Sequence, residues 1–448
     1  TYDMNPCEWD KPSLTGQCHL FGNVVSKEPD KFLELIHEAI KDDCILLAYP
    51  QAGMQGLLDA GRKDEAMQVL QEILEVIGYD VNSTVRGFSL HSLLFALNDI
   101  AKTGPVPEIV FALFCNAVLN AKEPEEDTHQ AEKDVYNVGM NQSRGNAGYM
   151  LVECAREEKY GEQIFSTFEQ IAETSSVYTR GAVLLNMAAL NFVDKDRNVR
   201  LFKKLLYDYN PRLMAMPVHN YNPLVYFVNY AASELMDFFQ HAADCPECYR
   251  EQVIILWLAW SHNNHDEHIK VLLDKMCDNS EDARISLMEF FCTLNEKMGE
   301  DAVCYIMHFM AKQFDSPRMG EVCDNLFHYT KNWPEDITRR VAEAYVSSPL
   351  SKHKTRTFIG FLAGYAIVNP IQTLIWLELV MGDNIPNEYH TWNNVVDVII
   401  QSYNGIKQFN DSSCQDALEN AMDLIDTIMQ NPSNKNLIGN FINKLDNE

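Results

Sequence analysis

The chain has 448 residues, of which 46% are hydrophobic and 22% are charged, so it is long enough for several hydrophobic cores or for one elongated, repeating core. Its 64 acidic and 36 basic side chains give a formal net charge of −28, which opposes the phosphate backbone of nucleic acids. The composition therefore argues against nucleic acid as a direct partner and predicts a folded protein rich in helix formers.

Apolar residues recur at helical spacing along almost the whole chain, as in Ile164, Phe168 and Ile171, whereas strand-type alternation is hard to find. Helices of ordinary length joined by short polar links usually pair antiparallel. A long succession of such pairs is typical of helical repeats. We therefore predict an all-α fold, an α-solenoid of antiparallel helix pairs with HEAT-like or tetratricopeptide-like repeats.

An acidic segment at residues 122–134 (KEPEEDTHQAEKD) interrupts this pattern and is predicted to be a loop. Otherwise residues 1–448 are expected to form one continuous solenoid. Within it we distinguish three sub-blocks, residues 1–120, 135–278 and 279–448.

Four arginines follow short polar turns and are predicted to start apolar helices; they are Arg86, Arg144, Arg180 and Arg284. Their separations along the chain are 58, 36 and 104 residues, and the 36 residues from Arg144 to Arg180 are near the unit length of helical repeats. We expect these arginines to be structural repeat positions that bond carbonyls or carboxylates of a neighbouring repeat. This expectation favours HEAT-like repeats over tetratricopeptide repeats.

The segment Tyr207–Tyr230 places tyrosines among apolar residues. Aromatic side chains are enriched at protein interfaces, so this segment is the first choice for a protein-binding surface. The alternative is that the rings pack between successive helix pairs. The candidate residues are Tyr207, Tyr209, Tyr221, Tyr226 and Tyr230.

Cys245 and Cys248, followed by His262 and His268, have the spacing of a two-Cys, two-His zinc site. The apolar stretch between them is predicted to be a helix, in which fourteen residues span about 21 Å, too far for one tetrahedral ion. A smaller cluster of His241, Cys245 and Cys248 remains as the candidate metal site, with a redox pair as the alternative. We expect neither a metal nor a cofactor in this chain.

Helix start signals continue to the end of the chain: Ser280 before the helix that contains Ile285–Met298, Pro334 before Ile337–Val346, and Asp411-Ser412-Ser413 before Ala417–Met429. The most apolar stretch, Phe358–Met381, is split by Asn369-Pro370. It is therefore expected to form two buried helices, not a membrane span.

The sequence contains neither a phosphate-binding Gly-x-x-x-x-Gly-Lys-Ser/Thr loop nor a Gly-x-Gly-x-x-Gly fingerprint. Gly87-Phe-Ser-Leu-His91 lacks the last glycine of a nucleophile elbow. We therefore expect this chain not to be an enzyme. Its twelve scattered cysteines, together with the lack of an N-terminal signal pattern, predict a reducing, cytoplasmic location.

Residues 138–149 (VGMNQSRGNAGY), 194–206 and 211–215 resemble a helical-repeat segment in the C-terminal sensor region of large bacterial STAND NTPases. Ser143, Arg144, Gly145 and Ala147 match structural positions of that repeat. The resemblance implies that a foreign protein, such as a phage portal or terminase, docks on the repeats. Docking would then favour oligomerisation and switch on an effector elsewhere in a longer protein.

The chain begins with Thr1 and not with methionine, which we interpret as a sign of additional upstream sequence. Three functions are carried forward. The leading one is the ligand sensor of a STAND-type antiviral defence protein. The alternatives are a HEAT-like adaptor or scaffold that binds a host protein, and an enzyme with a site near Cys245 and Cys248.

Overall fold

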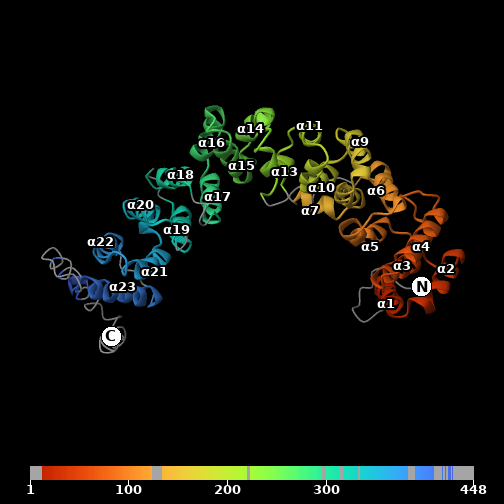
Figure 1. Cartoon of the computed structure of the whole chain (residues 1–448), viewed down its shortest axis with the longest axis horizontal. Coiled ribbons are helices and arrows are strands. Elements are labelled where there is room, and N and C mark those ends of the chain that lie inside the picture. The colour runs from red at the N-terminus through yellow and green to blue at the C-terminus, as the bar shows by residue number, and fades with distance from the viewer. Residues whose placement is uncertain are drawn as a thin grey trace. The chain divides into compact units, whose positions relative to one another are not determined.

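The computed structural model describes residues 13–123, 134–218, 222–294, 299–311, 316–330, 333–381 and 389–407, together with a few positions between 416 and 426. In these residues the regular structure is helical throughout and contains no strand, which confirms the prediction of an all-α, solenoid-like fold (Figure 1). The chain divides into two compact units, residues 1–269 and 270–448. The loop expected at 122–134 lies largely outside the described residues.

Unit 1 consists of short α-helices joined by turns and single 3-10 turns. In chain order they are α1 (Leu14–Lys27), α2 (Pro29–Lys41), α3 (Ala48–Asp59), α4 (Lys63–Val76), η1 (Val85–Gly87), α5 (Leu90–Thr103), α6 (Glu108–Asn120), α7 (Val135–Met140), α8 (Ser143–Glu153), η3 (Cys154–Arg156), η4 (Glu158–Tyr160), α9 (Gly161–Ile171), α10 (Val177–Asn186), η5 (Met187–Phe192), α11 (Lys195–Leu205), α12 (Pro211–Met214), α13 (Pro223–Phe227), η6 (Ala232–Leu235), α14 (Met236–Ala243), η7 (Pro246–Cys248) and α15 (Tyr249–His262).

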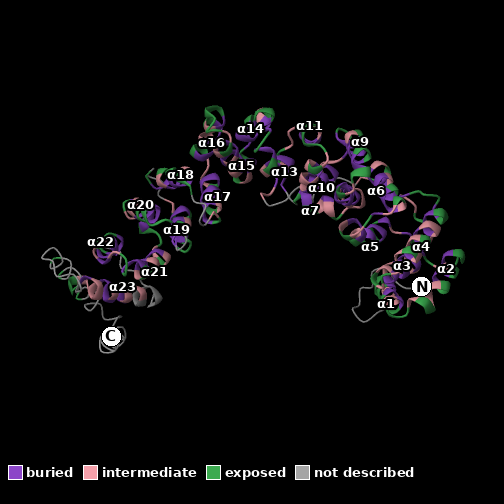
Figure 2. Ribbon diagram, in the orientation of Figure 1, coloured by how far each residue is buried: buried purple, intermediate pink, exposed green. Residues whose placement is uncertain are grey.

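Alternate helices of unit 1 pack against one another. α1 packs on α3, α6 on α8, α8 on α10, and α9 on α11. The periodicity of α9 explains its contacts, because Ile164, Phe168 and Ile171 lie on one face of the helix and are all buried. Buried residues gather where neighbouring helices face each other (Figure 2). Each such apolar side chain contributes about 1.5–3 kcal/mol to the stability of the fold.

Helices α7, α8 and α10 approach unusually closely, and glycine makes this approach feasible. A Cβ atom at Gly139 would overlap the carbonyl oxygen of Tyr178 in α10, and one at Gly145 would overlap the carbonyl oxygen of Gly139. Real side chains do not reach such distances, so both positions need a residue without Cβ. This packing gives a physical reason for the Ser-Arg-Gly sequence at the start of α8.

In unit 2 the helices form two alternating rows. α17, α19, α21 and α23 pack in sequence in one row, and α18, α20 and α22 in the other. This double row is the arrangement expected for helical repeats. The elements are α16 (Glu267–Asn279), which crosses the boundary between the units, α17 (Glu281–Cys292), α18 (Glu300–Ala311), α19 (Pro317–Leu326), α20 (Glu335–Val346), η10 (Pro349–Lys352), α21 (Arg356–Tyr365), α22 (Pro370–Met381) and α23 (Tyr389–Lys407).

Two helix starts of unit 2 lie where the sequence predicts them. The Ser280 side chain accepts a hydrogen bond from the backbone N–H of Ala283 at the start of α17. Pro334 directly precedes α20. The start predicted at Asp411-Ser412-Ser413 lies outside the described residues.

The apolar stretch 358–381 is divided as expected. α21 ends at Tyr365 and α22 begins at Pro370, which occupies the first helical position, where its missing N–H needs no partner. Among the described residues, no helix combines the length and the hydropathy needed to cross a membrane.

Candidate protein-binding surface and the buried arginines

Three exposed aromatic side chains lie on or beside the neighbouring elements η5 and α13 of unit 1, and we call them the aromatic patch: Phe192, Tyr226 and Tyr230. Phe192, at the end of η5, is 93% exposed, Tyr226 in α13 is 44% exposed and Tyr230 is 38% exposed. The hydroxyl group of Tyr230 donates a hydrogen bond to Asn191 Oδ1 over 2.8 Å, which brings the turn after α13 to the residue beside Phe192. η5 and α13 also pack against each other.

Buried hydrogen bonds hold the end of η5 in place. The amide group of Asn198, which is fully buried, donates to Met187 O at 2.9 Å and to Asn191 Oδ1 at 3.0 Å. Asp194 caps the following helix by accepting from the N–H of Arg197. Phe192 is therefore presented from a fixed support, and its exposure does not reflect a loose loop.

Charges of both signs surround the patch. The ammonium group of Lys195 lies 5.4 Å from the centre of the Tyr230 ring. Burial raises the pKa of Tyr230 to about 12, and the carboxylates of Asp196 and Glu234 contribute to this increase. A partner would meet aromatic surface bordered by ions of both signs, which is typical of a protein-binding site with a polar rim.

The other tyrosines predicted for the surface make different contacts. Tyr207 is 51% exposed, and the guanidinium group of Arg180 lies 5.0 Å from its ring centre. The ring of Tyr209 stacks on the ring of His241 with 3.7 Å between centroids. Tyr221 lies outside the described residues. The structure thus groups Tyr226 and Tyr230 with Phe192, a residue that the sequence analysis missed.

The four arginines singled out in the sequence share one kind of contact. Each donates hydrogen bonds to carbonyl groups near the C-terminal end of a helix, where the helix dipole favours positive charge. The helices are α2 for Arg86, α6 for Arg144, α11 for Arg180 and α16 for Arg284. All four side chains are largely buried.

Arg86, Arg144 and Arg180 also meet a carboxylate located just after the helix end. Arg86 lies 3.8 Å from Asp43, Arg144 lies 2.6 Å from Glu123, and Arg180 pairs with Asp208 through two hydrogen bonds of 2.8 and 2.9 Å. The sequence signal for the partner is therefore an acidic residue a few positions after an apolar helix.

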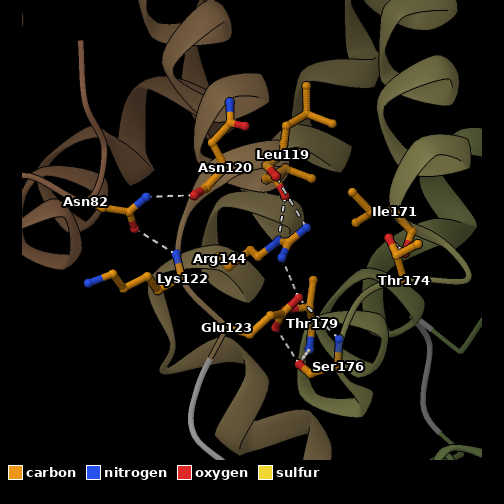
Figure 3. A network of polar contacts seen from close by, with 11 residues as sticks. Asn82, Leu119, Asn120, Lys122, Glu123, Arg144, Ile171, Thr174, Ser176 and Thr179 are labelled. Carbon is orange, nitrogen blue, oxygen red and sulfur yellow. Dashed lines mark hydrogen bonds and ion pairs between the residues drawn. The ribbon is translucent and has the colours of Figure 1, made fainter. Parts of the chain in front are cut away.

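The Arg144 contacts extend to a third helix (Figure 3). Arg144 Nε donates to Val118 O at 2.7 Å, and Nη1 lies 2.6 Å from Glu123. The same Glu123 carboxylate accepts from Ser176 Oγ at 2.6 Å and from Thr179 Oγ1 at 2.8 Å at the start of α10. One carboxylate thus connects α6, α8 and α10.

Asn82 holds the chain just before this carboxylate (Figure 3). Its amide group donates to Asn120 O at 2.7 Å, and its Oδ1 accepts from the N–H of Lys122 at 2.8 Å. These two bonds fix the backbone between the end of α6 and Glu123.

Two details of the arginine prediction are wrong. Arg86 does not start an α-helix: it lies in the 3-10 turn η1 with φ 50°, and α5 begins only at Leu90, after the N-cap Ser89. The 36-residue spacing is not a repeat of one contact either. Arg144 bonds a helix that precedes it, whereas Arg180 bonds α11, which follows it.

The cysteine pair lies in a buried turn. Cys245 and Cys248 are 8% and 0% exposed, with 2.9 Å between their sulfur atoms. Burial raises the pKa of both thiols, that of Cys248 most strongly. His241 Nδ1 donates a hydrogen bond of 2.7 Å to the backbone oxygen of Asp237, and the ring stacks on Tyr209. Helix α15 separates Cys248 from His262, as predicted.

Within the described residues, no three His, Cys, Asp or Glu side chains are arranged to hold a metal ion. The His241, Cys245 and Cys248 cluster predicted from the sequence is therefore not assembled as a metal site. His241 turns to the backbone of its own helix and to Tyr209, which accounts for its absence from the pair.

Unit 2 contains a hollow of about 690 Å³ between α18 and α20. Its walls are mainly apolar, from Met310, Ala344 and Pro349 among others, and Cys304 and His308 also line it. Arg340 reaches the same hollow, where Glu300 binds its guanidinium group with two hydrogen bonds of 2.5 and 2.9 Å. No sequence motif marks this region, because its residues come from helices about 30 positions apart.

No protein-family model, no curated protein and no solved structure matches the chain. The resemblance to the sensor region of STAND NTPases therefore remains a prediction from the residues that carry it.

Proposed function

We propose that this chain recognises another protein, and that the aromatic patch of Phe192, Tyr226 and Tyr230 is the centre of the contact. The observation that carries the proposal is the near-complete exposure of Phe192 on a loop whose neighbours are held by buried hydrogen bonds. Exposed aromatic rings on a rigid support lose little conformational entropy on binding, so they are effective anchors.

In the fuller form of the proposal, the chain is the sensor of a STAND-type defence protein. The ligand is then a foreign protein, such as a phage structural or packaging protein, and binding favours oligomerisation of a longer chain that carries the effector. The resemblance at Ser143, Arg144, Gly145 and Ala147 supports this form. The helical stack supports it as well, since it offers an extended surface for a protein ligand.

The test compares two exposed phenylalanines of unit 1. Phe192→Ala and the control Phe95→Ala, which removes a ring that is 74% exposed in α5, are assayed against purified phage portal and terminase proteins by biolayer interferometry. We expect Phe192→Ala to weaken binding at least tenfold, in the range of an interface hot spot, and Phe95→Ala less than twofold.

Equal losses in the two variants would remove the aromatic patch from the proposal. If neither protein binds the unaltered chain, the phage-sensor form is wrong, and the binding of a host protein becomes the better proposal.

The second candidate function is an adaptor or scaffold that binds a host protein constitutively. The aromatic patch serves this function equally well. The two candidates differ in their response to the ligand. A sensor oligomerises in its full-length form when the ligand is added, whereas the molecular mass of an adaptor increases only by the mass of the bound ligand. Light scattering of the full-length protein with and without ligand distinguishes them.

The third candidate, an enzyme with a site near Cys245 and Cys248, has less support. Both thiols are buried and their pKa values are raised, which keeps them protonated and weakly nucleophilic. We therefore propose binding and not catalysis for this chain.

A further inference from the structure

Cys245 and Cys248 belong to one tight turn that places their sulfur atoms side by side. Cys245 directly precedes the 3-10 turn η7, Pro246 opens it and Cys248 ends it. The N–H of Cys248 donates to the carbonyl oxygen of Cys245 over 3.0 Å, which closes the turn. The two sulfur atoms are 2.9 Å apart, compared with about 2.05 Å in a disulfide bond. A small movement of the two side chains is therefore enough to join them.

Hydrogen bonds on both sides of this turn hold it against neighbouring helices. In the first turn of α15, Gln252 Nε2 donates to the carbonyl oxygen of Met214 in α12 over 2.6 Å. The hydroxyl group of Tyr249 donates to the carbonyl oxygen of Ala243 in α14 over 2.9 Å. Neither bond involves a sulfur atom, so both can persist when the thiols are oxidised.

The thiols themselves contribute little to holding the turn. Cys245 Sγ donates to Glu247 Oε2 over 3.3 Å, and Cys248 Sγ donates to the carbonyl oxygen of Pro211 over 3.5 Å. A thiol is a weak hydrogen-bond donor. Oxidation removes both protons, and the fold loses only these two weak bonds.

The two cysteines differ in access, and the loop between them is short. Cys245 is 8% exposed and Cys248 is 0% exposed, so a reagent from solvent reaches Cys245 first. A disulfide stabilises a fold mainly by closing a long loop, whereas residues 245–248 are consecutive positions of one turn. A bond between them would constrain the unfolded chain little, which favours a reversible role over a structural one.

We propose that Cys245 and Cys248 form a reversible disulfide by exchange with a small disulfide such as glutathione disulfide. Cys245 loses its proton, and its sulfur attacks one sulfur of glutathione disulfide, whose S–S bond breaks and releases one glutathione thiolate. Cys248 then loses its proton and attacks Cys245 Sγ, which releases the second glutathione thiolate. The two thiolates take up the two protons, so the protein is oxidised by two electrons and glutathione disulfide is reduced to two thiols.

This exchange is slow and does not depend on the proposed function. Burial raises the pKa of both thiols, so little thiolate is present at neutral pH. No residue of the aromatic patch takes part in the exchange.

The experiment maps the cysteines of the full chain after oxidation. The reduced chain is incubated with excess glutathione disulfide for several hours and quenched with acid, and the remaining thiols are alkylated with N-ethylmaleimide in denaturant. Residues 213–250 form one tryptic peptide whose only cysteines are Cys245 and Cys248. By mass spectrometry, we expect most of this peptide to have lost two hydrogen atoms and to carry no N-ethylmaleimide. Dithiothreitol should reverse the change.

Two variants test the order of the steps. In Cys248→Ser the first step can occur but the second cannot, so the peptide should carry one glutathione on Cys245. In Cys245→Ser the remaining Cys248 is fully buried and should be recovered as an alkylated thiol. Circular dichroism verifies that each variant is folded. The mapping of the unaltered chain needs no substitution and decides the question even if a variant fails to fold.

The exposed cysteines Cys44 and Cys304 are the internal control, because each should form a mixed disulfide with glutathione in the same sample. A peptide 213–250 with two alkylated thiols, in a sample where Cys44 and Cys304 carry glutathione, would overturn the proposal. Glutathione on both Cys245 and Cys248 would overturn it as well, since the two thiols would then react separately.

Discussion

Arg144 and Arg180 follow similar sequences but form junctions of different design. The Arg144 junction comprises Arg144, the end of α6 and Glu123, and it extends through Glu123 to the start of α10. The Arg180 junction comprises Arg180, the end of α11 and Asp208, whose carboxylate also accepts from the N–H of Asn210 in the turn that follows. The first connects three helices, whereas the second connects two.

This difference shows that the sequence motif predicts which groups the arginine contacts but does not predict which helix supplies them. A buried guanidinium group needs carbonyl oxygens and a carboxylate. The end of any helix that is followed by an acidic residue offers both. Whether this helix precedes or follows the arginine in the chain depends on the packing of the elements.

The largest effect is expected from removing the guanidinium groups themselves. Arg144→Met should lower the free energy of unfolding of unit 1 by about 3 kcal/mol, and Arg180→Met by about 2 kcal/mol, since both guanidinium groups are largely buried and the first junction connects more helices. Urea unfolding followed by circular dichroism measures both.

Lys31→Met is the control for these two variants. It breaks a pair with Glu28 in which both side chains are more than half exposed, so its cost should stay below about 0.5 kcal/mol. If Arg180→Met costs clearly more than Arg144→Met, the three-helix connection through Glu123 contributes little to stability.

The next effect concerns the glycine that follows each arginine. Gly145→Ala should cost about 1–3 kcal/mol, because the new Cβ meets the carbonyl oxygen of Gly139. Gly181→Ala should be neutral or stabilise the fold by up to about 0.5–1 kcal/mol. Its Cβ would be no closer than 3.4 Å to its neighbours, and alanine favours the helix. Thermal unfolding of both variants tests the contrast, which equal shifts would contradict.

A smaller effect depends on pH and concerns the Arg180 junction. Hydrogen bonding to Arg180 holds the pKa of Asp208 below its usual range. Because the folded pKa is lower than the unfolded pKa of about 3.9, the stabilisation is present above pH 4 and is lost as the pH falls through the folded value. The stability gap between the unaltered chain and Asp208→Asn, measured by urea unfolding, should therefore shrink below pH 4. A gap that stays constant from pH 7 to pH 3 would argue against the pair.

The smallest effect is expected at Tyr207, whose ring lies beside the Arg180 guanidinium group. Tyr207→Leu should cost about 0.5–1 kcal/mol, the strength of a cation–π contact at an exposed site. Tyr207→Phe keeps the ring and should be nearly neutral, so a loss of equal size in both variants would assign the effect to the hydroxyl group.

The fold could be predicted from the sequence because helical periodicity and caps act locally. Ser280 and Asn369-Pro370 mark helix boundaries through their own backbone chemistry, independently of tertiary contacts. The surface could not be predicted in the same way. The exposure of Phe192 depends on the contacts of Asn191 and Asn198, and the partners of the arginines depend on which helices meet. The 36-residue spacing between Arg144 and Arg180 suggested one repeat unit, whereas the two arginines form different junctions.

The two alternating rows of unit 2 also bear on how this part of the chain folds during synthesis. Each helix packs mainly against helices one or two places away in the chain, so most stabilising contacts close short loops. Packing can therefore begin as soon as three or four helices have left the ribosome, before the remainder exists. Each new helix finds its earlier neighbours already in place, so the uncovered apolar surface of the nascent chain is limited to the most recently made helices.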